Sequence, residues 1–210
     1  MDPAPSMNDD REVILSRVRG ALAPLERRAP YPSYPGDVAV MREIVDWKDP
    51  WSVFCQRAKL VNGEGVERVE DVVALLRAGQ WLHGYCDPKL WPRLAPAFGA
   101  EFSVETELDR ARVDDYQFGI TRAVGAIAET GTIILNDTTT SRRLGALAPW
   151  VHIAVLRREE VLANVAQAVA VLGDDPNIIW CTGPSKTADV EGILIEGVHG
   201  PGRQIALLMG

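Results

Sequence analysis

The chain has 210 residues, of which 47% are hydrophobic and 24% are charged, as expected for one globular domain with an extension. Its formal net charge of −7 argues against binding to a nucleic-acid backbone, which requires clustered lysine and arginine. No apolar run approaches the roughly 18 residues that cross a bilayer, and the acidic N-terminus is unlike a secretion signal, so we expect a cytoplasmic protein without membrane insertion.

Residues 1–48 are predicted to form an N-terminal extension. After a short tail, apolar residues recur at helical spacing from Asp9 or Asp10 until Pro24, which predicts a helix. Four prolines and two tyrosines follow between Pro24 and Pro35, a composition typical of an extended arm. The arm either docks on the domain as a linker or contacts a partner.

Residues 49–210 are predicted to form an α/β domain. Asp49-Pro50 suits the start of a helix, because Asp can cap and Pro fits the first helical position. Apolar segments then alternate with helical patterns, which are clearest at Val72–Ala78 and Glu159–Leu172. This alternation predicts a three-layer, Rossmann-like fold with a mostly parallel sheet. The expected strands lie near Gly65–Val69, Trp81–Cys86, Phe102–Glu107, Ala126–Leu135, Val151–Leu156, Asn177–Thr182 and Gln204–Met209.

A carboxylate interrupts one of these apolar strands. Glu129 stands in Ala126–Leu135, where burial would be costly without a partner. It can act as a nucleophile, as a proton-transfer group or as an anchor for a ligand. The alternative is a structural carboxylate at a strand end, paired with an arginine such as Arg122 or Arg142.

Hydroxyl and small residues follow the strand at Asn177–Thr182. A helix is expected after Gly183-Pro184-Ser185, and its free N–H groups would suit a carboxylate or phosphate, with Lys186 and Thr187 adding charge and a hydroxyl. Plain helix capping by Ser185 or Thr187 is the alternative. Because ligands gather at the carboxyl ends of parallel strands, this segment and Glu129 are expected to share one site.

Two further polar stretches are candidates. His199 lies in a Gly-rich loop before the last strand, where it either donates a proton in the site or completes a tight turn. The segment Asn136–Arg143 places hydroxyls beside Arg142 and Arg143, which can hold an anion or belong to a surface loop.

The chain offers no metal or redox motif. Cys55, Cys86 and Cys181 are widely separated, and a four-thiolate iron–sulfur cluster needs one cysteine more than the chain has. The three histidines lack metal-ligand spacing, and the loop at Gly197–Gly202 does not have the dinucleotide-binding fingerprint. We therefore expect no metal and no cofactor in this chain.

Three motifs resemble the LUD-domain family, and within it the lactate-utilisation C group: Ala128–Thr132, then Gly183–Glu191, then Gly197–Pro201. The resemblance runs from mid-chain to the C-terminus. It implies the fold of the sugar-phosphate isomerase and CoA-transferase superfamily. It also implies a part in oxidising L-lactate to pyruvate together with iron–sulfur partner proteins, and a bound small anionic ligand. A stand-alone isomerase or CoA-transferase using Glu129 and a non-catalytic scaffold are the rivals.

The resemblance and the motifs together define a predicted site. Its catalytic candidates are Glu129 and His199. The ligand-binding candidates are Thr130, Gly131, Thr132, Gly183, Pro184, Ser185, Lys186, Thr187, Asp189 and Gly200.

Overall fold

The structure is a computed structural model that describes residues 7–24, 48–140, 142–172, 175, 177–188 and 194–210. The chain divides into two compact units, Met1–Arg42 and Glu43–Gly210. The first contains helix α1 (Met7–Leu22), close to the predicted helix. Nearly all of the predicted proline-rich arm lies outside the described residues. None of the described helices is long and apolar enough to cross a membrane.

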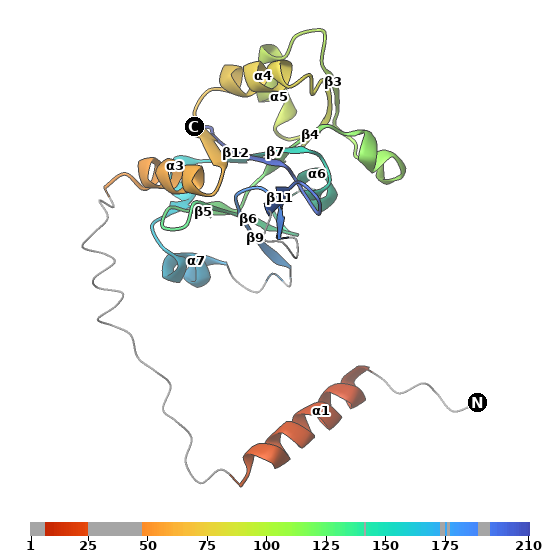
Figure 1. The fold of residues 1–210 in the computed structure, drawn as a ribbon, viewed down its shortest axis with the longest axis vertical. Coiled ribbons are helices and arrows are strands. Elements are labelled where there is room, and N and C mark those ends of the chain that lie inside the picture. The colour runs from red at the N-terminus through yellow and green to blue at the C-terminus, as the bar shows by residue number, and fades with distance from the viewer. Residues whose placement is uncertain (1–6, 25–47, 141, 173–174, 176, 189–193) are drawn as a thin grey trace. The chain divides into compact units, whose positions relative to one another are not determined.

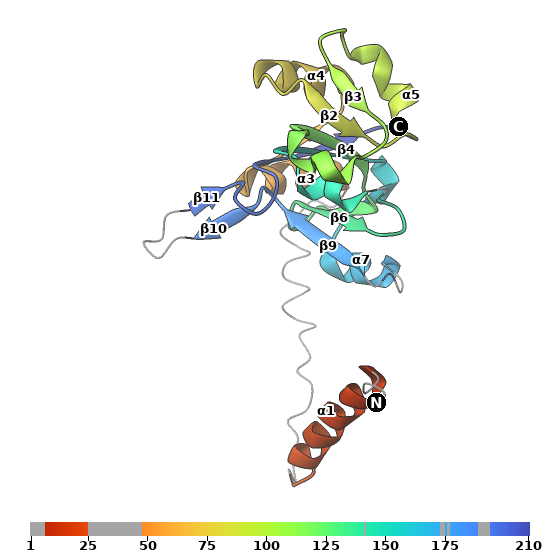
Figure 2. The same ribbon diagram turned by 90° about the vertical axis from the view of Figure 1, so that its right-hand side faces the viewer.

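A six-stranded sheet forms the centre of the second unit (Figures 1 and 2). Its order is β1-β12-β7-β4-β2-β3, and every neighbouring pair is parallel. This confirms the predicted α/β class with a mostly parallel sheet. The strands are β1 (Gly63–Val66), β2 (His83–Cys86), β3 (Ser103–Glu105), β4 (Phe118–Arg122), β7 (Val151–Leu156) and β12 (Arg203–Leu208).

Helices cover the first face of this sheet. Helix α4 (Val69–Ala78) carries acidic residues in its first turn and Arg77 in its last, which suits the helix dipole. Its buried Val72 and Leu76 pack with strand residues such as Ile153. The short helical segments α5 (Trp91–Leu94) and η1 (Ala95–Ala97) lie between β2 and β3 along the chain.

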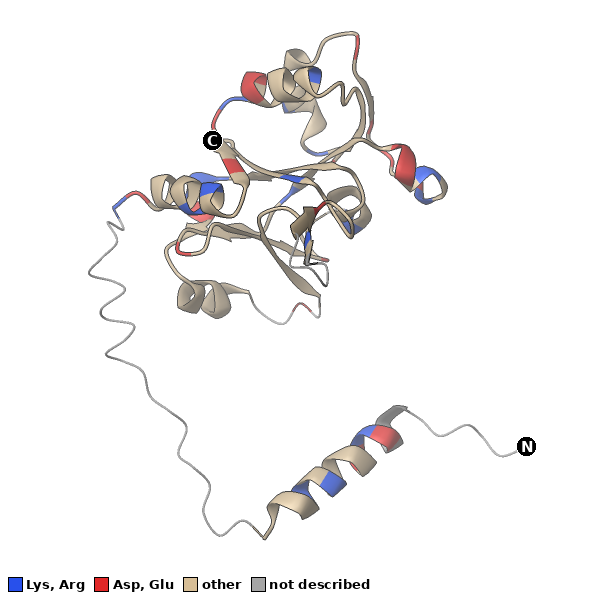
Figure 3. Ribbon diagram, in the orientation of Figure 1, with Lys and Arg blue, Asp and Glu red and all other residues tan. Residues whose placement is uncertain are grey.

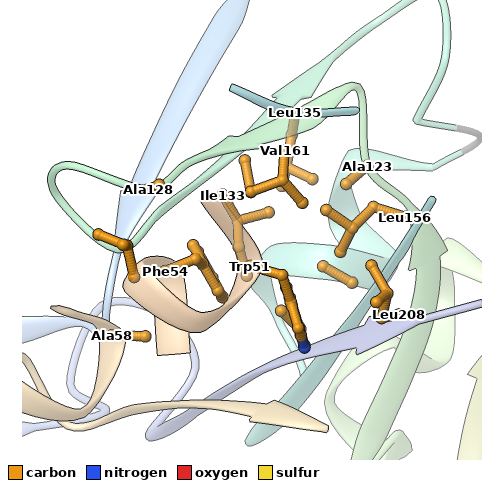
Figure 4. Close-up of a cluster of buried hydrophobic side chains, with 14 of the residues drawn as sticks. Trp51, Phe54, Ala58, Ala123, Ala128, Ile133, Leu135, Leu156, Val161 and Leu208 are labelled. Atoms are coloured by element: carbon orange, nitrogen blue, oxygen red, sulfur yellow. The ribbon is translucent and has the colours of Figure 1, made fainter. Parts of the chain in front are cut away.

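The second face is covered by a smaller sheet together with helices α3 (Pro50–Leu60) and α6 (Arg143–Leu147). Figure 4 shows Trp51 and Phe54 of α3 packed with Ile133 and Leu156 in the core between the two sheets. Proline begins α3 as predicted, but Asp49 makes no capping hydrogen bond and instead pairs with Arg158. This second sheet was not predicted.

The smaller sheet has the order β8-β5-β6-β9, with β6 antiparallel to both of its neighbours. Helix α7 (Val165–Val171) packs on its other side through Ala168. A separate two-stranded hairpin, β10–β11, projects from the body in Figure 2. The strands are β5 (Gly125–Ile127), β6 (Thr132–Asn136), β8 (Val161–Leu162), β9 (Ile178–Thr182), β10 (Lys186–Ala188) and β11 (Leu194–Glu196).

Four details of the predicted elements are wrong. The segment Ala126–Leu135 is two strands joined by a turn, although Ile133–Leu135 is buried as expected. Strand β4 was missed. The stretch Glu159–Leu172 begins with the 3-10 turn η3 (Arg158–Glu160) and β8 before α7 starts. No helix follows Ser185, because the chain enters β10 there.

Candidate functional site

The first motif forms the turn of the β5–β6 hairpin. Gly131 has a φ of +64°, a left-handed conformation that favours glycine. A Cβ at this position would lie 2.4 Å from the backbone nitrogen of Ala58 in α3. Gly131 therefore lets the turn pack directly on the backbone of α3.

Glu129 contacts the beginning of helix α7. Its Oε2 accepts a hydrogen bond of 3.1 Å from the N–H of Val165, the first residue of that helix. Its own N–H donates to the carbonyl of Ala163. Helix N-termini leave such N–H groups without partners within the helix, so the carboxylate stabilises α7. The suggested partner Arg122 pairs with Glu160 instead.

Three threonine hydroxyls form a chain at this edge of the smaller sheet. Thr132 Oγ1 lies 2.6 Å from Thr130 Oγ1 and 2.7 Å from Thr182 Oγ1. Thr132 is buried, whereas Thr182 is exposed. The first motif therefore contacts Thr182, the residue that precedes the second motif, through a shared set of hydroxyls.

The second motif makes a sharp turn and enters the β10–β11 hairpin. Gly183 has a φ of +74°, and a Cβ there would lie 2.1 Å from the carbonyl oxygen of Val61. Pro184 is buried. Lys186 Nζ donates to that same carbonyl at 3.1 Å and lies 3.6 Å from Glu196. Its charge therefore already has partners.

The third motif closes against the second. The N–H of Ser185 donates to the carbonyl of Pro201, and the N–H of Gly197 donates to the carbonyl of Ser185, both at 2.9 Å. A Cβ on Gly200 would lie 3.2 Å from that of Ser185. His199 is exposed in this loop.

These contacts divide the predicted site into two groups. Thr130 and Thr132 join Thr182, whereas Ser185 joins Gly200 at the other end of a short turn. Glu129 is engaged by α7. Thr187 lies in β10 and is partly buried, and Asp189 lies outside the described residues.

The predicted location at the carboxyl ends of parallel strands is wrong for the second motif, which closes against the loop containing Gly200 and Pro201. The loop containing Gly200 precedes β12, and Arg203 donates to Trp150, which precedes β7. The loop therefore lies at the amino ends of these strands. The prediction failed because β9, which leads into Ser185, runs antiparallel to β6 in the smaller sheet.

An aromatic cavity of about 390 Å³ opens beside Gly197 and Gly200. Trp81, Tyr116 and Trp150 line it, together with polar Asp114 and Gln117. The three aromatic residues come from separate segments that precede the parallel strands β2, β4 and β7. Local sequence patterns do not bring these three aromatic residues together.

A buried polar cluster crosses three strands of the parallel sheet and was also missed. His152 Nε2 lies 2.9 Å from Thr121 Oγ1, and its Nδ1 lies 2.8 Å from Gln204 Nε2. Burial lowers the pKa of His152 to about 4, while its hydrogen bond with Gln204 acts in the opposite direction. The ring is therefore neutral at physiological pH. The sequence signal is a polar residue inside each of the apolar strands β4, β7 and β12.

The cysteines are poor nucleophiles. Burial raises the pKa of Cys55 and Cys181 to about 11 and that of Cys86 to about 12. Thiols with such values remain protonated at neutral pH. Among the residues that the structure describes, no three His, Cys, Asp or Glu side chains group as metal ligands would.

The fold and the motif contacts define an α/β protein in which a parallel sheet is backed by a smaller mixed one. The family model described as "LUD domain" matches residues 80–209, and the chain belongs to that family.

Curated relatives match about half of the chain. Lactate utilization protein C of Deinococcus radiodurans is 35% identical over 111 residues, which cover 50% of this chain and 52% of that protein. The protein of the same name from Bacillus licheniformis is 32% identical over 98 residues, 43% of this chain and 41% of its own. The chain thus spans about half, or less, of the length of these relatives.

A solved structure of a DUF162 family protein from Deinococcus radiodurans is also similar. It is 24% identical and has a TM-score of 0.48, with 85% of this chain and 100% of that chain covered.

Proposed function

We propose that this chain is a component of a lactate-utilisation system that oxidises L-lactate to pyruvate. The observation that carries this proposal is the similarity to proteins named lactate utilization protein C, together with the match of the LUD-domain model. The proposal places the protein in the cytoplasm and gives it a small anionic ligand.

Oxidation of a hydroxy acid releases two electrons, and cofactors normally carry that chemistry. The three cysteines of this chain are too few for a four-thiolate cluster. We therefore assign the electron-accepting iron–sulfur centres to partner proteins. In this arrangement the chain binds the substrate or docks the redox subunits.

Reconstitution tests the proposal. The purified full chain is assayed for lactate-dependent dye reduction, alone and with iron–sulfur partner proteins, alongside metal and flavin analysis. We expect no turnover by the chain alone and turnover by the mixture. Lactate turnover by the chain alone, with a stoichiometric redox cofactor bound, would overturn the division of roles.

A stand-alone isomerase or CoA-transferase is the second candidate function, because the first motif contains the carboxylate of Glu129. Glu129 and His199 would be the proton-transfer groups. The structural contact of Glu129 with Val165 provides another explanation for this carboxylate. The variant Glu129→Gln distinguishes the structural role from the catalytic one. Full activity of the reconstituted system with the folded variant would leave Glu129 as a structural residue. Lost activity of that system with unchanged folding would support a role of Glu129 in the chemistry.

A further inference from the structure

A second cavity, of about 440 Å³, concentrates positive charge in an acidic protein. Three arginines line it, Arg110, Arg142 and Arg143, with Asp137 as the one acidic residue among its lining groups. Arg110 begins the 3-10 segment η2 (Arg110–Asp115), and Arg143 begins α6, which contacts η2. Figure 3 shows arginine on both segments in blue.

The carboxylate of Asp137 is already engaged. Its Oδ1 lies 2.6 Å from Nε of Arg143, and its Oδ2 accepts a hydrogen bond of 2.6 Å from Asn177. By contrast, the ion pairs formed within the described part of the chain involve neither Arg110 nor Arg142. Two guanidinium groups at this cavity are therefore available to an anion.

The turn on one side of the cavity is held in place by its own hydrogen bonds. Thr140 is 2% exposed, and its hydroxyl donates to the carbonyl of Arg122 at 3.0 Å and accepts from the N–H of Asn136 at 3.3 Å. The side chain of Asn136 accepts from the N–H of Thr139 at 2.7 Å. These bonds fix the backbone that carries Asp137, and with it one wall of the cavity.

Leu108 and Leu144 add apolar surface to the same cavity. A volume of this size lies at the small end of the range of ligand sites, roughly 300–1,000 Å³. Guanidinium groups match the planar, paired oxygens of carboxylates and also bind phosphate oxygens. The combination suits a small organic anion with a short apolar part.

We propose that this pocket binds a small organic anion through its carboxylate or phosphate group, with Arg110 and Arg142 as the charged contacts. Arg143 is held by Asp137 and also lines the pocket. The inference does not rest on the proposed role in lactate utilisation, because binding is measured on the isolated chain whereas that role is measured in the reconstituted system.

Calorimetric titration of the purified full chain at low salt tests the proposal. The probes are L-lactate, pyruvate, inorganic phosphate and neutral lactamide. We expect at least one anion to bind and lactamide not to bind. Preference for lactate and pyruvate would identify a carboxylate site, and preference for phosphate would identify a phosphate site.

Charge-removing variants locate the binding. Arg110→Gln and Arg142→Gln should each weaken anion binding about tenfold or more. Arg68→Gln, a matched control, removes the same charge from an exposed residue that does not line the cavity, and it should leave binding unchanged. Circular dichroism verifies that all three variants fold. Absence of anion binding, or equal affinity in all variants, would overturn the proposal.

Discussion

The two sheets of the domain differ in how they use polar and glycine residues. The parallel sheet is built from strands such as β7, whose six residues are all buried, and its internal polar groups are paired with one another. The smaller sheet carries its distinctive residues in turns, where Gly131 and Gly183 meet the backbone of α3 and the loop after it. A motif of small and hydroxyl residues can therefore mark a tight junction between layers as well as a site of chemistry.

The largest expected effect tests this junction directly. Gly131→Ala places a methyl group 2.4 Å from the Ala58 nitrogen in a left-handed backbone conformation, so we expect a loss of at least about 3 kcal/mol in the free energy of unfolding. Urea denaturation measures it. Gly200→Ala is the control, because its nearest neighbour is a side-chain carbon at 3.2 Å and its φ is not positive. Equal losses of unfolding free energy in the two variants would contradict a special role of Gly131 at this junction.

Acid should affect the parallel sheet first. The unfolded pKa of histidine is about 6.5, and that of buried His152 is about 4, so between these values the unfolded state binds a proton that the folded state does not. Stability should therefore be level above about pH 6.5 and fall as the pH decreases towards 4, by up to about 3 kcal/mol.

The control for this acid effect is His152→Gln. Carboxylates whose pKa is lowered in the folded state, such as Glu160, lose their contribution only at lower pH, so the interval from pH 6.5 to 5 reports on His152. Denaturation midpoints across that interval should decrease in the parent protein and stay level in the variant. Midpoints that stay level with pH in the parent protein would contradict the conclusion that the ring of His152 is buried and neutral.

A moderate effect is expected from the hydroxyl chain of the smaller sheet. Thr132→Val keeps the shape of a buried residue and removes its hydrogen bonds with Thr130 and Thr182. Thr182 is exposed and Thr130 partly so, and water can replace the lost bonds. We expect a loss of about 1 kcal/mol by urea denaturation. A loss several times larger would show that these hydroxyls are closed to water.

The smallest effect is expected at Glu129. Replacement with glutamine keeps an oxygen that can accept from Val165 but removes the charge at the start of α7, so stability should decrease by about 0.5 kcal/mol. Thermal unfolding at low and high salt measures the change, and salt should reduce it. A large destabilisation would mean that the carboxylate has a stronger structural role than its contact indicates.

Sequence patterns predicted the parallel sheet well where burial is complete. Val151–Leu156 is apolar at all but one position, and its predicted and observed limits agree. Strand β4 escaped prediction because Gly119, Thr121 and Arg122 dilute its apolar character. Its place between β2 and β7 depends on contacts far away in sequence.

The motif region was harder to predict because its residue types suit several structures. Hydroxyl residues after Gly183 can cap a helix or pair in a hairpin, and the pairing of β10 with β11 decides between them. Gly131 was equally ambiguous, because it lies within a segment that reads as one strand. Its role in a turn becomes clear only from its close approach to α3. The arginine-lined cavity joins segments about 30 residues apart, which local patterns do not reveal.

The position of β12 between β1 and β7 has a consequence for synthesis of the protein. Within the described part of the chain, β1 pairs in its sheet with β12 alone, although about 140 residues separate them. Translation proceeds at about 5–20 residues per second, so β1 waits several seconds or more for its partner to leave the ribosome. Once β7 has been made, its edge that will receive β12 also stays open until β12 follows. An unpaired strand edge makes a nascent chain prone to aggregation, and chaperones protect chains in this state.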